Sequence, residues 1–487
     1  MNRNIRSIAL FALAVASAHL VAAQPLTLPG VIGDNMVLQR GQPVPIWGWA
    51  TPGAKVSVQF AGQMRTATAR ADGRWEVRLR SLAASAEPAT LTITAGETRV
   101  LTNILVGEVW LASGQSNMEK PIGEQRGQLP VVNHEKELAE SDYPQIRLFK
   151  VTKTVAAQPQ SAVTNSGWRL CNATTHEAIK FSAAAYFFGR EIHRQLKVPV
   201  GLIDSSWGGT RIEPWTPPAG FALVKKLKDE VKLPGADTKF DNRTPTALYN
   251  GMIAPLVPFA LRGALWYQGE SNCIGDTNRL AYTDKMEALI IGWRQVWGEG
   301  PFPFYSVQIA PFRYYTATPQ PRVDTPDALP LLWEAQINSL RIRNTGLAVT
   351  TDLVDNLSDI HPTNKQDVGK RLALLALAKT YGRKDIVASG PVFKSVKLRD
   401  NKAILSFTET SGGLVSKDGK SLNWFSVAGS DGRFISASAV IVGDTVEVTS
   451  ASLPRPKAVR FAWDETAQPN FFNGAGLPAR PFRTDVP

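Results

Sequence analysis

Strand-like apolar runs alternate with helical patterns through the middle of the chain. Such alternation is typical of a parallel sheet with helices on both faces, because every parallel connection has to cross the sheet. We therefore predict an α/β fold, a three-layer α/β/α domain over residues 106–390, with ligands bound beyond the carboxyl ends of its strands. The expected strands are 105–112, 198–204, 261–267, 304–309 and 346–351, and the expected helices are 182–196, 282–297 and 363–380.

The last of these helices has a predicted start signal. Thr363 and Gln366 fit a capping box, and Val368, Leu372 and Leu375 fall on one helical face.

Residues 24–105 and 391–487 have a different pattern, with short alternating segments between Gly and Pro turns. Many short strands with turns between them are typical of β-sandwiches. We expect a β-rich, sandwich-like domain on each side of the central one. The expected strands are 44–49, 55–60, 75–79, 89–94, 395–398, 402–407, 439–442, 445–448 and 459–463.

The first 23 residues are typical of a secretory signal peptide. Arg3 and Arg6 precede an apolar run, and small residues at 21–23 offer a cleavage site. The run is shorter than the ~20 residues that span a bilayer, and no later segment resembles a membrane span. These features predict a periplasmic or secreted protein.

Composition excludes several classes of protein. Removing the leader takes away two Arg and no acidic residue, so the net charge falls from +12 to +10. No run of five or six Lys and Arg marks a nucleic-acid surface. Two cysteines, Cys171 and Cys273, are too few for a disulfide framework or an all-cysteine zinc site, although they can pair in an oxidising compartment. The oligomeric state is unknown from the sequence.

Metal and nucleotide motifs are incomplete. His134-Glu135 and His176-Glu177 begin like H-E-x-x-H, but Leu138 and Lys180 stand where the second His belongs. Gly419-Lys-Ser421 ends like a P-loop whose first Gly is missing, and no G-x-S-x-G occurs. We predict neither a metal nor a cofactor.

Ser116 is the candidate nucleophile, because it follows the strand-like run 105–112 at a carboxyl end. A serine hydroxyl needs a base, usually His. Of the four His beyond the leader, His193 lies in a predicted helix, while His134 and His176 lie in polar, loop-like stretches. His361 follows the last predicted strand, so it is the best candidate base.

Several ordered segments resemble the sialate O-acetylesterase family of carbohydrate esterases, within the SGNH (GDSL-like) hydrolases. They extend over nearly all of the chain beyond the leader. The segments are Asn35-Met-Val-Leu-Gln-Arg40, Gly107-Glu-Val-Trp110, Ser113-Gly-Gln-Ser-Asn-Met-Glu119, Ser206-Trp-Gly-Gly-Thr-Arg211, Trp266-Tyr-Gln-Gly-Glu-Ser-Asn272, Asp359-Ile-His-Pro362 and Gly474-Ala-Gly-Leu-Pro-Ala479.

The resemblance implies an SGNH hydrolase fold and metal-free hydrolysis of acetyl esters on sugars. It implies Ser116 as nucleophile and His361 as general base. Candidate oxyanion donors are the backbone N–H groups of Ser116 and Gly209 and the side chain of Gln268.

The acid of the triad is open at this point. SGNH enzymes commonly place it three residues before His, where this chain has Ser358. Asp359 is our choice; Asp355 and Glu270 are alternatives, and a dyad is another. Glu270 and Asn272 can instead support the loop.

Arg211, Glu213 and Trp215 are candidates for the mouth of the site. Arg211 can bind a carboxylate such as that of sialic acid, or pair with Glu213. The expected substrate is acetylated hemicellulose (xyloglucan or xylan), which we favour, or O-acetylated sialic acid. The rivals are an SGNH lipase or thioesterase, and a catalytically dead carbohydrate-binding protein.

Overall fold

The central sheet is parallel through most of its width. In this computed structural model, which describes residues 25–163, 167–235 and 237–485, its strands follow the order β13-β12-β11-β7-β10-β8-β9. Neighbours from β13 to β8 are parallel, and β9 runs antiparallel at the edge. The strands are β7 (Glu97–Gly114), β8 (Tyr143–Lys150), β9 (Arg169–Cys171), β10 (Val200–Ser206), β11 (Gly263–Tyr267), β12 (Phe304–Val307) and β13 (Thr345–Ala348). The predicted signal peptide lies outside the described residues.

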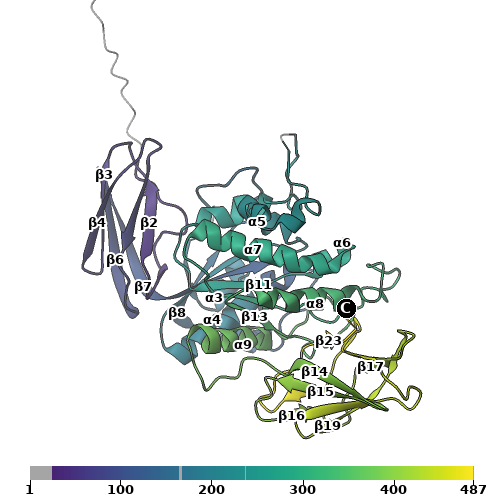
Figure 1. Cartoon of the computed structure of the whole chain (residues 1–487). Helices are drawn as coiled ribbons and strands as arrows, with labels where there is room; N and C mark the ends of the chain where they lie inside the picture. The colour runs from purple at the N-terminus through teal and green to yellow at the C-terminus, as the bar shows by residue number, and fades with distance from the viewer. Residues whose placement is uncertain (1–24, 164–166, 236, 486–487) are drawn as a thin grey trace, which may run out of the picture.

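Helices cover both faces of this sheet (Figure 1). On one face α4 (Ala183–Leu196) packs against α9 (Lys365–Leu375), and on the other α5 (Pro218–Leu223) packs against α7 (Tyr282–Trp297). Strands β10 to β13 are buried along their whole length, as expected for strands covered on both faces. The predicted three-layer α/β/α architecture is confirmed. The remaining helices are α1 (Ser116–Glu119), α2 (His134–Ala139), α3 (Ala173–Ile179), α6 (Glu270–Gly275) and α8 (Ala328–Asn338).

The start of α9 differs from the predicted capping box. Asn364, not Thr363, is the cap, and its side chain accepts a hydrogen bond from the Asp367 backbone N–H at 3.0 Å. The Thr363 hydroxyl donates instead to Asp355 Oδ2 at 2.8 Å. The predicted cap is therefore wrong by one residue, because Thr363 is occupied by the preceding loop.

The N-terminal β region continues directly into the central sheet. Strand β7 passes without a break through residue 105, where we predict the domain boundary. Its first half pairs with β6, and its second half pairs with β10 and β11. The strands before it are β1 (Val37–Gln39), β2 (Val44–Trp49), β3 (Lys55–Phe60), β4 (Gln63–Thr68), β5 (Arg74–Leu79) and β6 (Ser85–Ala95).

The C-terminal region has two four-stranded antiparallel sheets, ordered β14-β15-β20-β19 and β18-β17-β21-β23. Phenylalanine rings join them: Phe393 of β14 stacks on Phe482 of β23 with centroids 4.5 Å apart. Its strands are β14 (Val392–Arg399), β15 (Lys402–Thr408), β16 (Leu414–Ser416), β17 (Phe425–Ala428), β18 (Phe434–Ser436), β19 (Ser438–Val442), β20 (Thr445–Thr449), β21 (Ala458–Phe461), β22 (Phe471–Asn473) and β23 (Phe482–Arg483).

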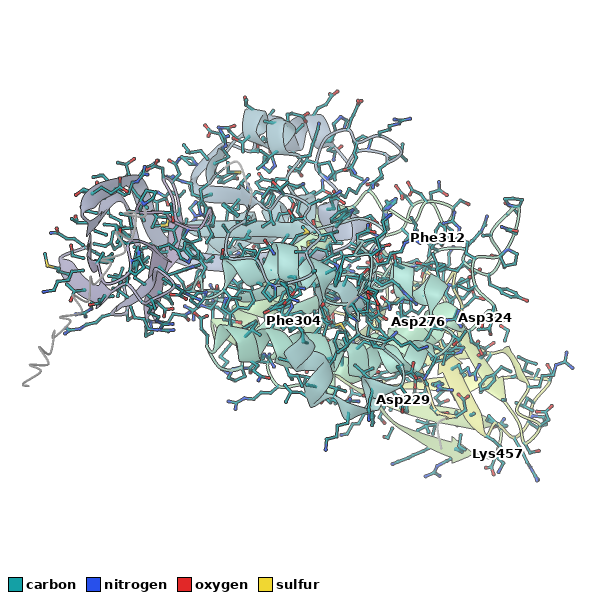
Figure 2. The ribbon with its side chains drawn as sticks, turned by 90° about the horizontal axis from the view of Figure 1, so that it is seen from above. Asp229, Asp276, Phe304, Phe312, Asp324 and Lys457 are labelled. Atoms are coloured by element: carbon teal, nitrogen blue, oxygen red, sulfur yellow. The ribbon has the colours of Figure 1, made fainter. Side chains whose placement is uncertain are left out.

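Figure 2 shows the three parts in a row, with Phe304 in the central part and Lys457 in the last. Among the described helices, none combines the length and apolar content that crossing a membrane requires. Cys171 and Cys273 are both described, buried and unpaired, so the disulfide that the sequence allows does not form.

Candidate active site

Three strand ends bring the predicted site residues to one edge of the sheet. The register places Ser206 of β10 and Tyr267 of β11 on either side of Gly114 of β7. The segments that follow these strands carry Ser116, the paired glycines Gly208 and Gly209, and Gln268. Gly114 has φ +138°, and a Cβ there would lie 2.2 Å from the Tyr267 carbonyl oxygen, so a side chain is excluded.

Ser116 begins the short helix α1 and is half-buried, whereas its neighbour Asn117 is buried. The turn after β10 lies directly against it: a Cβ on Gly208 would be 3.3 Å from Ser116 Cβ. Glu119 Oε2 holds this turn by accepting the Gly208 N–H at 2.6 Å. Gly209, the next residue of this turn, is exposed and has φ +75°.

The His361 loop returns to the same edge. Asn117 Nδ2 donates to the Ile360 carbonyl at 3.0 Å, which fixes the loop against the helix that carries Ser116. His361 Nδ1 lies 3.6 Å from Asp359 Oδ1, and the His361 backbone N–H donates to the same oxygen at 2.9 Å. Burial, and then the charge of Lys365, lower the pKa of His361 to about 4. The imidazole is therefore neutral near pH 7, as a general base must be.

The other two candidate acids have different partners. Asp355 accepts from Thr363, as described above. Glu270 is buried, and its Oε1 accepts from Asn117 Nδ2 at 2.6 Å. Within the described part of the chain, Asp359 is the carboxylate that forms a contact with His361.

Gln268 is fully buried beneath the edge. Its Nε2 faces three acceptors: Gln115 Oε1 at 3.0 Å, the Thr210 carbonyl at 3.3 Å and Asn272 Oδ1 at 2.8 Å. Since the amide has two hydrogens, a role for Gln268 as oxyanion donor requires one of these bonds to be released. Asn272 in turn donates to Glu213, which is consistent with loop support.

Two of the three predicted sugar-contacting residues are not at the mouth. Trp215 is 0% exposed and donates from Nε1 to Thr210 Oγ1 at 3.0 Å. Glu213 is 7% exposed and pairs with Lys285 Nζ at 2.7 Å. Their predicted roles as substrate contacts are wrong, because the segment that carries them turns into the core.

Arg211 remains partly exposed, and its guanidinium pairs with Asp276 rather than Glu213. Figure 2 shows Asp276 on the side of the central part that faces the C-terminal region. Trp207, half-exposed and next to Gly208, is an aromatic neighbour of the site that sequence reasoning did not select. Lys153 Nζ lies 5.6 Å from the centroid of its ring.

Sequence reasoning also missed the residues that hold the edge together. Gln115 Oε1 accepts from Gln268 and from the Ser271 backbone N–H, and Asn117 Oδ1 accepts from Lys365 Nζ at 2.7 Å. The signal was present, since Gln115 and Asn117 flank Ser116 within the resembling segment 113–119. Within the described ranges, no group of three or more His, Cys, Asp or Glu side chains is placed to hold a metal ion.

Comparisons with known proteins show the family of this chain. The family described as "carbohydrate esterase, sialic acid-specific acetylesterase" matches residues 106–378. A solved carbohydrate acetylesterase from Xanthomonas citri superposes with a TM-score of 0.84 at 39% identity, covering 95% of this chain and 100% of that one.

Two mammalian relatives are similar over most of their length. The rat sialate O-acetylesterase is 29% identical over 93% of each chain. The human sialate O-acetylesterase is 31% identical over 77% of this chain and 75% of its own. The chain therefore belongs to the carbohydrate esterase family of sialic acid-specific acetylesterases.

Proposed function

We propose that this enzyme removes acetyl groups from O-acetylated sugars with Ser116 as nucleophile, His361 as base and Asp359 as the acid of the triad. Family membership makes it a carboxylic ester hydrolase of the carbohydrate esterase type. The observation that supports the triad is the hydrogen bond from Asn117, next to Ser116, to the carbonyl of Ile360, next to His361. The Nδ1 atom of His361 in turn faces Asp359.

The reaction follows from these positions. Ser116 Oγ attacks the acetyl carbonyl carbon, and His361 takes the hydroxyl proton. The bond from the carbonyl carbon to the sugar oxygen then breaks, and His361 returns the proton to that oxygen. Water then attacks the carbonyl carbon of the acetyl-enzyme, and His361 takes a proton from it. The bond from the carbonyl carbon to Ser116 Oγ breaks, His361 returns the proton to Oγ, and the acetyl group leaves as acetic acid, which ionises to acetate.

The negative charge on the tetrahedral oxygen needs fixed donors. The backbone N–H groups of Ser116 and Gly209 are our candidates, because the turn that carries Gly209 lies against Ser116. Gln268 joins them if it releases one internal acceptor. Loss of one such donor lowers the rate by ~10²–10³-fold in enzymes of this kind.

For the substrate we propose a neutral acetylated hemicellulose, xyloglucan or xylan, reached in the periplasm or outside the cell after removal of residues 1–23. The supporting observation is the pairing of Arg211 with Asp276, which already supplies a carboxylate to this guanidinium. A sialic acid carboxylate would have to displace it. The half-exposed Trp207 offers a ring for stacking against a sugar.

The rate of acetate release from acetylated xylan, acetylated xyloglucan and O-acetylated sialic acid tests both the proposed nucleophile and the proposed substrate. We expect faster release from the two polysaccharides, and a loss of at least ~10³-fold in Ser116→Ala with the fold unchanged. The exposed Ser358→Ala is the matched control and should retain activity. Retained activity in Ser116→Ala would exclude it as nucleophile, and selectivity for acetylated sialic acid would reverse the substrate assignment.

A further inference from the structure

A fully buried lysine lies directly behind the catalytic edge. Lys365, the first residue of α9, is 0% exposed. Lysine is almost never fully buried unless it is paired. No carboxylate within the described ranges lies at ion-pair distance; instead, Nζ donates to Asn117 Oδ1 at 2.7 Å and lies 5.1 Å from the Tyr267 ring centroid. The hydrolytic steps do not use this amine, so its burial needs another explanation.

The Asn117 carboxamide connects the Lys365 amine to a buried carboxyl group. Its oxygen accepts from Lys365, while its nitrogen donates to Glu270 Oε1 at 2.6 Å. Glu270 Oε2 is buried and finds no hydrogen-bond partner among the described residues. The donor at one end and the acceptor at the other fix the orientation of the Asn117 amide.

That orientation matters for Ser116 and His361. The same Asn117 nitrogen donates to the Ile360 carbonyl, so rotation of the amide would break the link to the His361 loop. Lys365 also lies four residues after His361 in the chain, at the start of α9. The lysine therefore determines, through a single side chain, where the nucleophile and the base stand relative to each other.

Lys365 also acts on His361 electrostatically. The charged groups that face His361 are Asp359 in its own loop, Lys365 from α9 and Lys120 after α1. After burial, Lys365 is the largest cause of the low pKa of His361, and Lys120 acts in the same direction. Asp359 opposes both.

Lys365 itself is also surrounded by both basic and acidic side chains. Burial, and then Lys120, lower the pKa of Lys365 to about 7, whereas Glu270, Asp359 and Asp355 raise it. Lys365 therefore carries its proton in mild acid, which is the range where an ordinary histidine would become protonated.

We propose that Lys365 is a positioning residue for the hydrolysis: its buried amine, bonded to Asn117, holds the segments of Ser116 and His361 in one frame and places a positive charge behind the His361 loop. This inference rests on the proposed roles of Ser116 and His361. It predicts an esterase that remains active well below the ordinary pKa of histidine.

The pH profile of kcat/KM on a small acetyl ester tests the charge. Lys365→Gln keeps a donor for Asn117 but removes the charge, so its acidic limb should move up by roughly one pH unit, since a nearby charge shifts a pKa by about 1–3 units. We also expect kcat to fall with little change in KM. Lys365→Arg, which keeps the charge, should leave the limb in place.

Lys285→Gln is the control for the loss of a buried lysine. Lys285 pairs with Glu213 and Asp276, at 2.7 and 2.8 Å, so its loss should lower stability without moving the limb. If the Lys365→Gln enzyme is folded and the acidic limb of its kcat/KM profile lies at the same pH as in the wild type, the proposal is overturned.

A second measurement does not depend on how the Lys365 variants fold. An NMR titration of the histidines in the wild-type enzyme, with His361 assigned from the spectrum of His361→Ala, should place the His361 pKa below about 5. Titration near 6.5 would overturn the proposal. The two hypotheses fail separately: activity retained in Ser116→Ala or His361→Ala refutes the proposed triad, whereas a His361-dependent enzyme with an unmoved limb refutes only the role of Lys365.

Discussion

At the scale of single residues, the candidate acids are separated by what each carboxylate contacts. Asp359 faces His361 Nδ1 at 3.6 Å, whereas Glu270 binds Asn117. Their environments differ, because Glu270 is buried, which raises its pKa, while Asp359 is partly exposed. A buried carboxyl that bonds a side-chain amide is suited to holding a loop, and a carboxyl oxygen beside the imidazole Nδ1 is suited to orienting a base.

We therefore predict that Asp359→Asn lowers kcat/KM for acetyl esters by roughly 10²–10⁴-fold, because the imidazolium formed during attack loses its counter-charge. Glu270→Gln keeps an acceptor for Asn117 and should retain most activity. Steady-state kinetics of the two variants, with circular dichroism to confirm folding, decide between them. The opposite order of losses would assign the acid to Glu270.

The sequence was sufficient for some of the site and insufficient for the rest. Ser116 and His361 were recognisable because each follows a strand and lies in a resembling segment. Trp215 and Glu213 were misplaced because the sequence does not show that the chain turns inward there, where Trp215 packs against Trp266. Lys365 was missed because nothing local distinguishes a buried lysine at a helix start from an exposed one.

At the scale of elements, the predicted bounds agree with the observed ones where the local sequence pattern is strong. The predicted bounds of β2, β3 and α7 are those observed, because alternation and helical periodicity are strong there. Strand β8 was missed, since Pro144 and Arg147 interrupt its apolar pattern while its partner β10 supplies the pairing. His134 and His176 were placed in loops but lie in α2 and α3, whose six and seven residues are too few to show a period.

The corrected cap of α9 gives a prediction about this element. Asn364→Ala should destabilise the protein by ~1 kcal/mol, because the Asp367 N–H loses its acceptor at the helix start. Urea unfolding measures this loss, with the exposed Lys370→Ala on the same helix as control, expected to stay within about 0.5 kcal/mol. Since α9 follows His361, a loss of kcat/KM should accompany it. If the variant is as stable as the wild type, Asn364 does not stabilise the start of the helix as a cap.

At the scale of the whole molecule, the two β regions join the catalytic layer differently. The N-terminal region shares strand β7 with the central sheet, so β1, β3, β4 and β6 belong to one sheet with the central strands, while β2 and β5 pair separately. The C-terminal region lies beside the catalytic part (Figure 1), and side chains bond the two. Trp463 donates to Asp327 at 3.1 Å, and Arg483 pairs with Glu334 at 2.9 Å.

A further contact of the C-terminal region, made by Glu465, supports a segment that bonds the His361 loop. Glu465 is 4% exposed and accepts from the Tyr315 N–H at 2.6 Å, the Thr316 N–H at 2.8 Å and the Thr316 hydroxyl at 2.7 Å. The segment that it holds continues to Arg313, whose N–H donates to the Leu357 carbonyl at 3.0 Å, four residues before His361. The C-terminal region thereby braces the catalytic loop.

We predict that Glu465→Ala lowers both stability and turnover, although it lies outside the segment that the family match covers. Each buried donor left unpaired costs about 1–3 kcal/mol, so urea unfolding should show a clear loss. The freed segment should also lower kcat, because the His361 loop loses its support, while KM changes less. Glu447→Ala is the control: this carboxylate pairs with Lys402 on the partly exposed face of the C-terminal sheet, so its loss should leave kcat unchanged. If Glu465→Ala loses stability but keeps full kcat, the C-terminal region contributes to the fold and not to the geometry of the base.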